Sequence, residues 1–178
     1  MLPKDLSIPE GLDLVEAQDG TTLLRKWRSW KVVPLIFFVI AWDSFLIFWY
    51  GMAFTSKEAP WLMIVFPIGH VAVGVGLTYY VLASLFNKTR IVCNPLGVRV
   101  RTSPIPWFGG NKMVWTQEIG HLRIRDKYDA NNPTTYMVMY ADNNRKERRL
   151  VAGLPEWEQA DFIARVVSAT VGRPYRGE

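Results

Sequence analysis

The chain has 178 residues, a formal net charge of +5 and a hydrophobic content of 49%. Its single cysteine, Cys93, excludes an intramolecular disulfide and any metal site built from several cysteines. Residues 87–178 contain 15 Lys and Arg against 9 Asp and Glu, so the second half of the chain carries the excess of positive charge. That half is long enough for one small domain.

Residues 1–30 are predicted to form an N-terminal arm that ends in a β-hairpin. The apolar-rich segments 12–17 and 21–27 flank an Asp19-Gly20 pair, and such a pair is a strong signal for a tight turn between two strands. Neither segment alternates cleanly between apolar and polar residues. The pattern therefore leaves open whether the two strands pair only with each other or join a sheet formed later in the chain.

Residues 31–86 are predicted to form a transmembrane helical hairpin. Two apolar runs, residues 32–54 and 60–86, are each long enough to cross a hydrocarbon core of about 30 Å at a helical rise of about 1.5 Å per residue. Tryptophans and tyrosines gather near the ends of both runs, as in the aromatic belts of membrane proteins. Pro67 is expected to kink the second helix about two turns after its start.

The cations around the two runs predict their orientation. Four cations precede the first run, namely Arg25, Lys26, Arg28 and Lys31, and two follow the second run, Lys88 and Arg90. The loop between the runs has only Lys57, next to Glu58. Because cytoplasmic loops are enriched in Lys and Arg, the sequence predicts a multi-pass protein of the cytoplasmic (inner) membrane with both termini in the cytoplasm.

Residues 87–178 are predicted to form a cytoplasmic β domain closed by a helix. Six β-patterned segments follow one another at residues 89–93, 96–102, 112–116, 119–127, 134–141 and 147–153. A helix is predicted at residues 155–171, with one apolar stripe made of Ala160, Ile163, Ala164, Val167 and Val171. The predicted fold class is therefore membrane α+β, a two-helix hairpin plus a small antiparallel β-barrel or sandwich capped by a C-terminal helix.

The order of these segments resembles the pleckstrin-homology-like (PH-like) domains of small bacterial membrane proteins that carry a transmembrane hairpin. The resemblance covers roughly residues 87–172 and depends on the strand order, the Asn-Lys-Thr-Arg-Ile-Val start and the closing Leu-Pro-Glu-Trp-Glu-Gln-Ala-Asp-Phe-Ile helix. Bacterial members of this group look like scaffolds or sensors rather than enzymes, so the resemblance implies that this chain works by binding. No lipid-binding motif of that family matches this chain residue by residue.

Asp43 and His70 are ionisable residues near the middle of the two apolar runs. Polar groups at that depth are costly in a bilayer and usually mark a helix contact or a function. Measured along the helices, the two residues fall within roughly one or two turns of each other. Three interpretations follow: a direct or water-mediated hydrogen bond between them, contacts with a partner subunit, or a role in binding a tetrapyrrole or relaying protons.

Small residues surround the histidine of the second run: Gly69, Ala72, Gly74, Gly76 and Thr78. The residues at 72 and 76, and those at 74 and 78, are small-xxx-small pairs that permit close packing of another helix, which is the favoured interpretation. They would also let a flat tetrapyrrole approach His70. No other cofactor is suggested by the sequence.

Cations alternate with apolar residues along two predicted strands. The alternating cations are Arg99, Arg101, Arg123, Arg125 and Lys127, and a later group contains Arg145, Lys146, Arg148 and Arg149. They predict a positive surface for anionic lipid headgroups or an acidic partner, with an ordinary solvated sheet face as the alternative. Nucleic acid is not expected, because no reading helix or recognised motif accompanies the charge.

Trp107 and Phe108 lie on a proline- and glycine-rich loop at residues 104–111. On a membrane-tethered domain, such a loop can enter the headgroup region or a groove on a neighbour. Packing of Trp107 under the sheet is an equally weighted alternative.

No catalytic constellation or metal site is recognisable, because the chain has two histidines, one cysteine and no glycine-rich phosphate loop. The sequence therefore predicts a non-enzymatic accessory, scaffolding or assembly subunit whose partners are other integral membrane proteins. Two alternatives stay open: lipid or stress sensing through the basic face, and pigment or haem ligation through His70 in a photosynthetic or respiratory complex.

Overall fold

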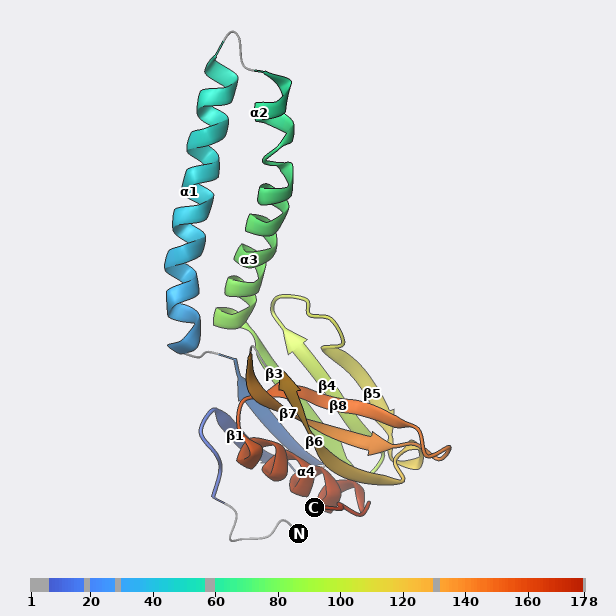
Figure 1. Cartoon of the computed structure of the whole chain (residues 1–178). Coiled ribbons are helices and arrows are strands. Elements are labelled where there is room, and N and C mark those ends of the chain that lie inside the picture. Colours follow the sequence, from blue (N-terminus) through green and yellow to red (C-terminus); the bar gives the residue numbers. More distant parts are fainter. Residues whose placement is uncertain (1–6, 18–19, 28–29, 57–59, 130–131, 178) are drawn as a thin grey trace. The chain divides into compact units, whose positions relative to one another are not determined.

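A computed structural model describes residues 7–17, 20–27, 30–56, 60–129 and 132–177. The chain divides into two compact units (Figure 1). A helical unit contains Trp27–Asn87, and a sheet unit combines Met1–Lys26 with Lys88–Glu178. The segment before the helices thus belongs to the same unit as the C-terminal strands.

The helical unit contains two helices long and apolar enough to cross a membrane, Val33–Thr55 and Trp61–Phe86. The first is α1 (Val33–Thr55), preceded by a short 3-10 turn (Trp30–Val32). The second is interrupted and consists of α2 (Trp61–Val65) and α3 (Ile68–Phe86). The interruption lies at the predicted position, because Pro67 has no N–H for the helical hydrogen-bond ladder.

The two helices pack along a narrow seam. The buried residues of α1 are Val39, Leu46 and Ala53, which follow one another at seven-residue intervals, and Gly74 and Val81 repeat the same interval on α3. This spacing is the one that keeps a single stripe of each helix against its partner. Only 11% of the apolar window of each long helix is buried in this way, so most of the apolar surface of the two helices is exposed.

The sheet unit contains eight strands in two antiparallel sheets. The larger sheet has the order β1-β2-β3-β4-β5, with β1 (Leu12–Ala17), β2 (Gly20–Lys26), β3 (Lys88–Asn94), β4 (Gly97–Ser103) and β5 (Asn111–Trp115). The smaller has the order β6-β7-β8, with β6 (His121–Asp129), β7 (Asn132–Ala141) and β8 (Glu147–Leu154). A short 3-10 turn (Thr116–Glu118) follows β5.

The strands on either side of the helices pair with each other. Strand β2 precedes α1 and β3 follows α3, and they are antiparallel neighbours with Leu23 opposite Ile91 and Lys26 opposite Lys88. The N-terminal hairpin therefore joins the C-terminal sheet, which settles the question that the sequence left open. The two helices are an insertion between neighbouring strands of one sheet.

Helix α4 (Trp157–Val171) packs on strands of both sheets and closes the core. All five residues of the predicted apolar stripe are buried, and Gly172 ends the helix with a φ of 66°. The helix begins at Trp157, two residues later than predicted. The predicted antiparallel strands and C-terminal helix are thus confirmed, and the described strands form two separate sheets around a core that includes Leu23, Leu122 and Ile163.

Long cationic side chains of the larger sheet reach the backbone of β8. The guanidinium of Arg25 donates to the carbonyls of Ala152, at 3.2 Å, and Gly153. The ammonium of Lys112 donates to the carbonyl of Arg149 at 2.8 Å. Arg25 is only 8% exposed, and burial lowers its pKa to about 10, so it stays charged at neutral pH. Among the described residues, no strand of one sheet pairs with a strand of the other, so these side-chain bonds connect the two sheets.

Candidate functional site

The carboxylate of Asp43, near the middle of α1, has a partner on α3. The hydroxyl of Thr78 donates to Asp43 Oδ2 at 2.8 Å. Gly74 makes this approach possible, because a Cβ at that position would lie 2.7 Å from Asp43 Oδ1. The direct bond between Asp43 and His70 that the sequence suggested is replaced by this Asp43–Thr78 bond, since the missing side chain at position 74 lets the carboxylate reach the next turn.

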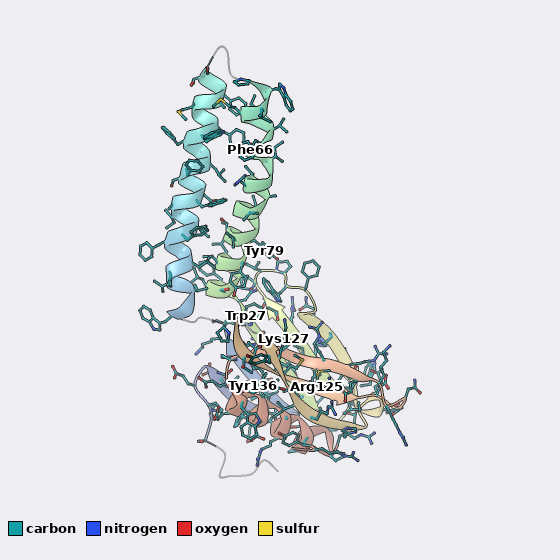
Figure 2. The ribbon with its side chains drawn as sticks, viewed as in Figure 1. Trp27, Phe66, Tyr79, Arg125, Lys127 and Tyr136 are labelled. Carbon is teal, nitrogen blue, oxygen red and sulfur yellow. The ribbon has the colours of Figure 1, made fainter. Side chains whose placement is uncertain are left out.

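The ring of His70 lies among aromatic side chains. It stacks on Trp42, with ring centroids 5.7 Å apart, and contacts Phe66, labelled in Figure 2, at 5.3 Å. The indole N–H of Trp42 also donates to the backbone carbonyl of His70 at 3.2 Å. The tetrapyrrole interpretation supposed that the neighbouring small residues leave space at this ring. Trp42 and Phe66 lie beside the ring, and His70 is half-buried.

Two side chains of α1 satisfy the backbone at the break between α2 and α3. The carbonyl of Met63 would normally accept the N–H of residue 67, which is proline, and it accepts the indole N–H of Trp49 at 3.0 Å instead. The hydroxyl of Tyr50 donates to the next carbonyl, that of Ile64, at 3.0 Å. Sequence reasoning missed these bonds and treated both aromatics only as belt residues.

The small residues of α3 divide between two faces. Gly74 and Thr78 face α1, and so this small-xxx-small pair is used within the hairpin. Gly69 and Gly76 have no atom of the described chain within 4 Å of an added Cβ, and Ala72 is exposed. These three residues occur at i, i+3 and i+7 and so share one stripe of the helix, which we call the outward stripe.

The basic residues do not form one surface. Arg99 and Arg101 are exposed on β4 of the larger sheet, on the side opposite to the buried Val98 and Val100. Arg123 and Arg125 lie on β6 of the smaller sheet, and both bind the carboxylate of Glu147, at 2.6 and 2.9 Å. Arg148 pairs with Asp142 at 3.1 Å. Carboxylates thus neutralise part of the charge that the sequence suggested for a ligand.

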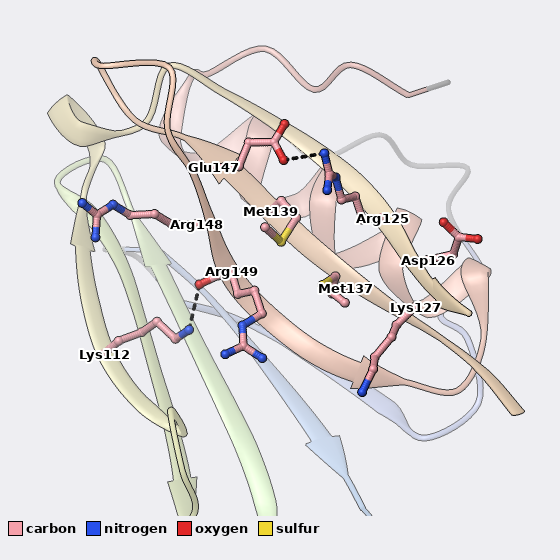
Figure 3. A pocket seen from close by; sticks show the side chains of 9 residues that line it. All are labelled: Lys112, Arg125, Asp126, Lys127, Met137, Met139, Glu147, Arg148 and Arg149. Carbon is pink, nitrogen blue, oxygen red and sulfur yellow. Dashed lines mark hydrogen bonds and ion pairs between the residues drawn. The ribbon is translucent and has the colours of Figure 1, made fainter. Parts of the chain in front are cut away.

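A shallow groove lies over the smaller sheet (Figure 3). Its volume is about 610 Å³, and residues of β5, β6, β7 and β8 line it. Lys127, which the sequence singled out, lies in this groove together with Lys112 and Arg149. Lys112 was missed, because its position on a strand of the other sheet gives no local signal that it reaches β8.

The loop between β4 and β5 exposes Phe108 completely, whereas Trp107 is partly buried. The loop follows Ser103, which is opposite Lys88 in the sheet, and Lys88 is in turn opposite Lys26. Lys26 and Lys88 are the residues at which the chain leaves the sheet unit for the helices and returns from them. The loop therefore emerges from the edge of the domain that carries both connections to the helices.

Among the described residues, no group of three or more His, Cys, Asp and Glu side chains is placed to hold a metal ion. Cys93 is buried in the core of the sheet unit, and burial raises the pKa of its thiol to about 12. The sequence matches no protein family, and comparison with curated proteins finds no match. A function for the chain therefore has to come from its own geometry.

Proposed function

We propose that this chain is a non-catalytic accessory or scaffolding subunit of a larger membrane complex, held in the cytoplasmic membrane by two spans. The observation that carries the proposal is the outward stripe of α3, where Gly69, Ala72 and Gly76 leave the helix backbone accessible. In lipid, helices associate through close van der Waals packing, and small residues permit it. A partner helix would pack against this stripe.

Several polar groups of the hairpin form hydrogen bonds within it, which supports a docking function over a polar pathway. Asp43 is paired with Thr78, and the carbonyls of Met63 and Ile64 accept bonds from α1. These polar groups lie between the two helices, so the outward stripe presents only small apolar residues. A partner can therefore bind this stripe without breaking the bonds inside the hairpin.

The sheet unit would act as the cytoplasmic part of the scaffold. Two antiparallel sheets closed by a C-terminal helix are consistent with the PH-like resemblance, and such domains present surfaces for binding. The insertion of both spans between β2 and β3 ties this domain to the membrane through two connections. A cytoplasmic location for it follows from the flanking cations.

A photoreactive amino acid at Ala72 tests the proposal in living cells. We expect it to form a cross-link to another membrane protein, because Ala72 lies on the outward stripe. The same group at Leu82, which is exposed on another part of α3, is the control and should react mainly with lipid. Equal cross-linking from both positions, or none from Ala72, would contradict docking through the outward stripe.

A second candidate function is contact of the domain with the lipid surface, and the exposed Phe108 favours it. The loop emerges beside Lys88, which follows the end of α3 by two residues, so the ring would meet the headgroup region. An environment-sensitive dye on Phe108→Cys should shift to shorter emission wavelength in nanodiscs than in detergent. The same dye on Leu96→Cys, an exposed position beyond the far end of β3, should not, and Cys93 is buried and should stay unlabelled.

A further inference from the structure

The groove over the smaller sheet is lined by several cations, of which Lys112 and Arg149 lie close together. Lys112 donates to the backbone of Arg149, and the positive charge of Arg149 adds to burial in lowering the pKa of Lys112. In Figure 3, the Arg149 guanidinium lies between the ammonium groups of Lys112 and Lys127. Lys112 is half-buried beside this second positive charge, and like charges repel, so an anion in the groove would stabilise it.

Carboxylates of the protein do not neutralise these three cations. Glu147 is shared by Arg123 and Arg125, and Asp142 pairs with Arg148. Within the described part of the chain, Lys112, Lys127 and Arg149 form no ion pair. Asp126 also lines the groove and forms no ion pair within the described residues. The lining thus holds five cations against two carboxylates, Asp126 and Glu147, and keeps an excess of positive charge.

The floor of the groove is apolar. Met137 and Met139 of β7 lie between the cations of β6 and those of β8 (Figure 3). An inorganic anion would gain nothing from these side chains, whereas a ligand with a carbon backbone next to its charge would contact both. The lining thus favours an amphipathic anion.

The strand register places Lys112 and Lys127 toward the edge of the domain from which the chain enters the helices, whereas Arg149 lies four residues before Gly153 on β8. Lys112 is the second residue of β5 and directly follows the loop of Phe108. Lys127 lies on β6 opposite Thr135, next to the Tyr136–Leu154 pair, and the neighbouring Gly153 accepts a bond from Arg25 of β2. Arg25 is the residue before Lys26, where β2 ends.

We propose that this groove binds the phosphate of an anionic phospholipid headgroup, with Lys112, Lys127 and Arg149 as the cationic ligands and Met137 and Met139 against the glycerol part. The inference rests on the proposed membrane anchoring, which keeps headgroups close to this edge of the domain. It differs from the basic face suggested by the sequence, because Arg99 and Arg101 take no part.

The test is calorimetric titration of the full-length protein in a nonionic detergent. The probe is a short-chain phosphatidylglycerol below its micelle concentration, and short-chain phosphatidylcholine, inorganic phosphate and a poly-glutamate peptide are titrated for comparison. The variant Lys127→Gln/Arg149→Gln should lose at least about ten-fold in phosphatidylglycerol affinity. Lys112 is left unchanged because it also connects β5 to β8. The control Arg99→Gln/Arg101→Gln removes the same charge from the other sheet and should change the affinity by less than about two-fold.

Three results would overturn the proposal. An equal loss of phosphatidylglycerol affinity in both variants would show that binding depends only on the overall charge of the protein. Inorganic phosphate that binds as tightly as phosphatidylglycerol would show a site for a free phosphate, and binding of poly-glutamate alone would show a site for an acidic protein. Cross-linking from Ala72 is measured on the same variants, so that failure of the groove is distinguished from failure of the accessory function.

Discussion

Two glycines of α3 that look equivalent in the sequence have different tasks in the structure. An added Cβ at Gly74 would lie 2.7 Å from the carboxylate of Asp43 and 3.3 Å from Trp42, whereas one at Gly76 would meet no described atom within 4 Å. Gly74 is thus required inside the hairpin. Gly76 is available to a partner, and substitutions at the two positions should separate folding from assembly.

Gly74→Leu should lower the stability of the hairpin by about 1 to 3 kcal/mol, because the added side chain forces the helices apart and breaks the Asp43–Thr78 bond. Gly76→Leu is the matched control and should change stability by less than about 0.5 kcal/mol. Unfolding of the full-length protein in mixed micelles, followed by tryptophan fluorescence, measures both. Equal stability of the two variants would contradict the packing of Gly74 against α1.

The buried thiol of Cys93 should make the stability of the domain depend on pH in the alkaline range. Burial raises the pKa of its thiol from 9.0 to about 12, so the folded domain holds a proton that the unfolded chain releases. The stabilisation is complete below about pH 9 and is lost toward pH 12, by about 1.4 kcal/mol per pH unit. Cys93→Ala should therefore show a shallower loss of melting temperature than the wild type between pH 9 and 11. Parallel curves for the two proteins would contradict burial of the thiol.

At the scale of elements, side chains replace missing backbone partners in both units. Trp49 supplies the donor that Pro67 lacks, and Arg25 and Lys112 supply donors to the backbone of β8. Each of these bonds joins elements that are distant in the sequence. Single side chains therefore hold the elements together where the backbone hydrogen bonding is interrupted. Each of these side chains can be tested by one substitution.

Arg25→Met should cost about 2 kcal/mol or more of the domain's unfolding free energy, because it leaves the carbonyls of Ala152 and Gly153 without their charged donor. Lys26→Met is the neighbouring control. Its ammonium pairs with Asp13 at the surface, so its loss should cost less than about 1 kcal/mol. Urea unfolding of the full-length protein in detergent, followed by the exposure of Cys93 to a thiol reagent, measures the difference.

Periodicity predicted the elements well where the signal is local. The apolar stripe of α4, the alternation of Val98 and Val100 with arginines, and the break at Pro67 are all in the structure. The pairing of β2 with β3 was not predictable, because about sixty residues of helix separate the two strands. For the same reason, the Asp43–Thr78 bond and the position of Lys112 beside Arg149 depend on register in three dimensions, which no local pattern encodes.

The whole molecule has both long helices inserted between neighbouring strands, so if these helices cross a membrane, the two ends of the hairpin lie on the same side of it. The flanking cations predict that this side is the cytoplasm. A reporter fused to the C-terminus should therefore be active only as a cytoplasmic fusion, and one inserted between α1 and α2 only on the opposite side. A C-terminus outside the cytoplasm would contradict the orientation.

The proposed accessory function requires that the outward stripe of α3 holds the chain in a larger complex. The most direct measurement is purification of the tagged full-length protein from its own membranes in a mild detergent, followed by mass spectrometry and an absorption spectrum. The wild type and Leu82→Ala should retain the same integral membrane partners, whereas Gly76→Leu should lose them while its hairpin stays folded. Equal retention by Gly76→Leu, a wild type that purifies alone, or a Soret-region band abolished by His70→Leu would contradict the account.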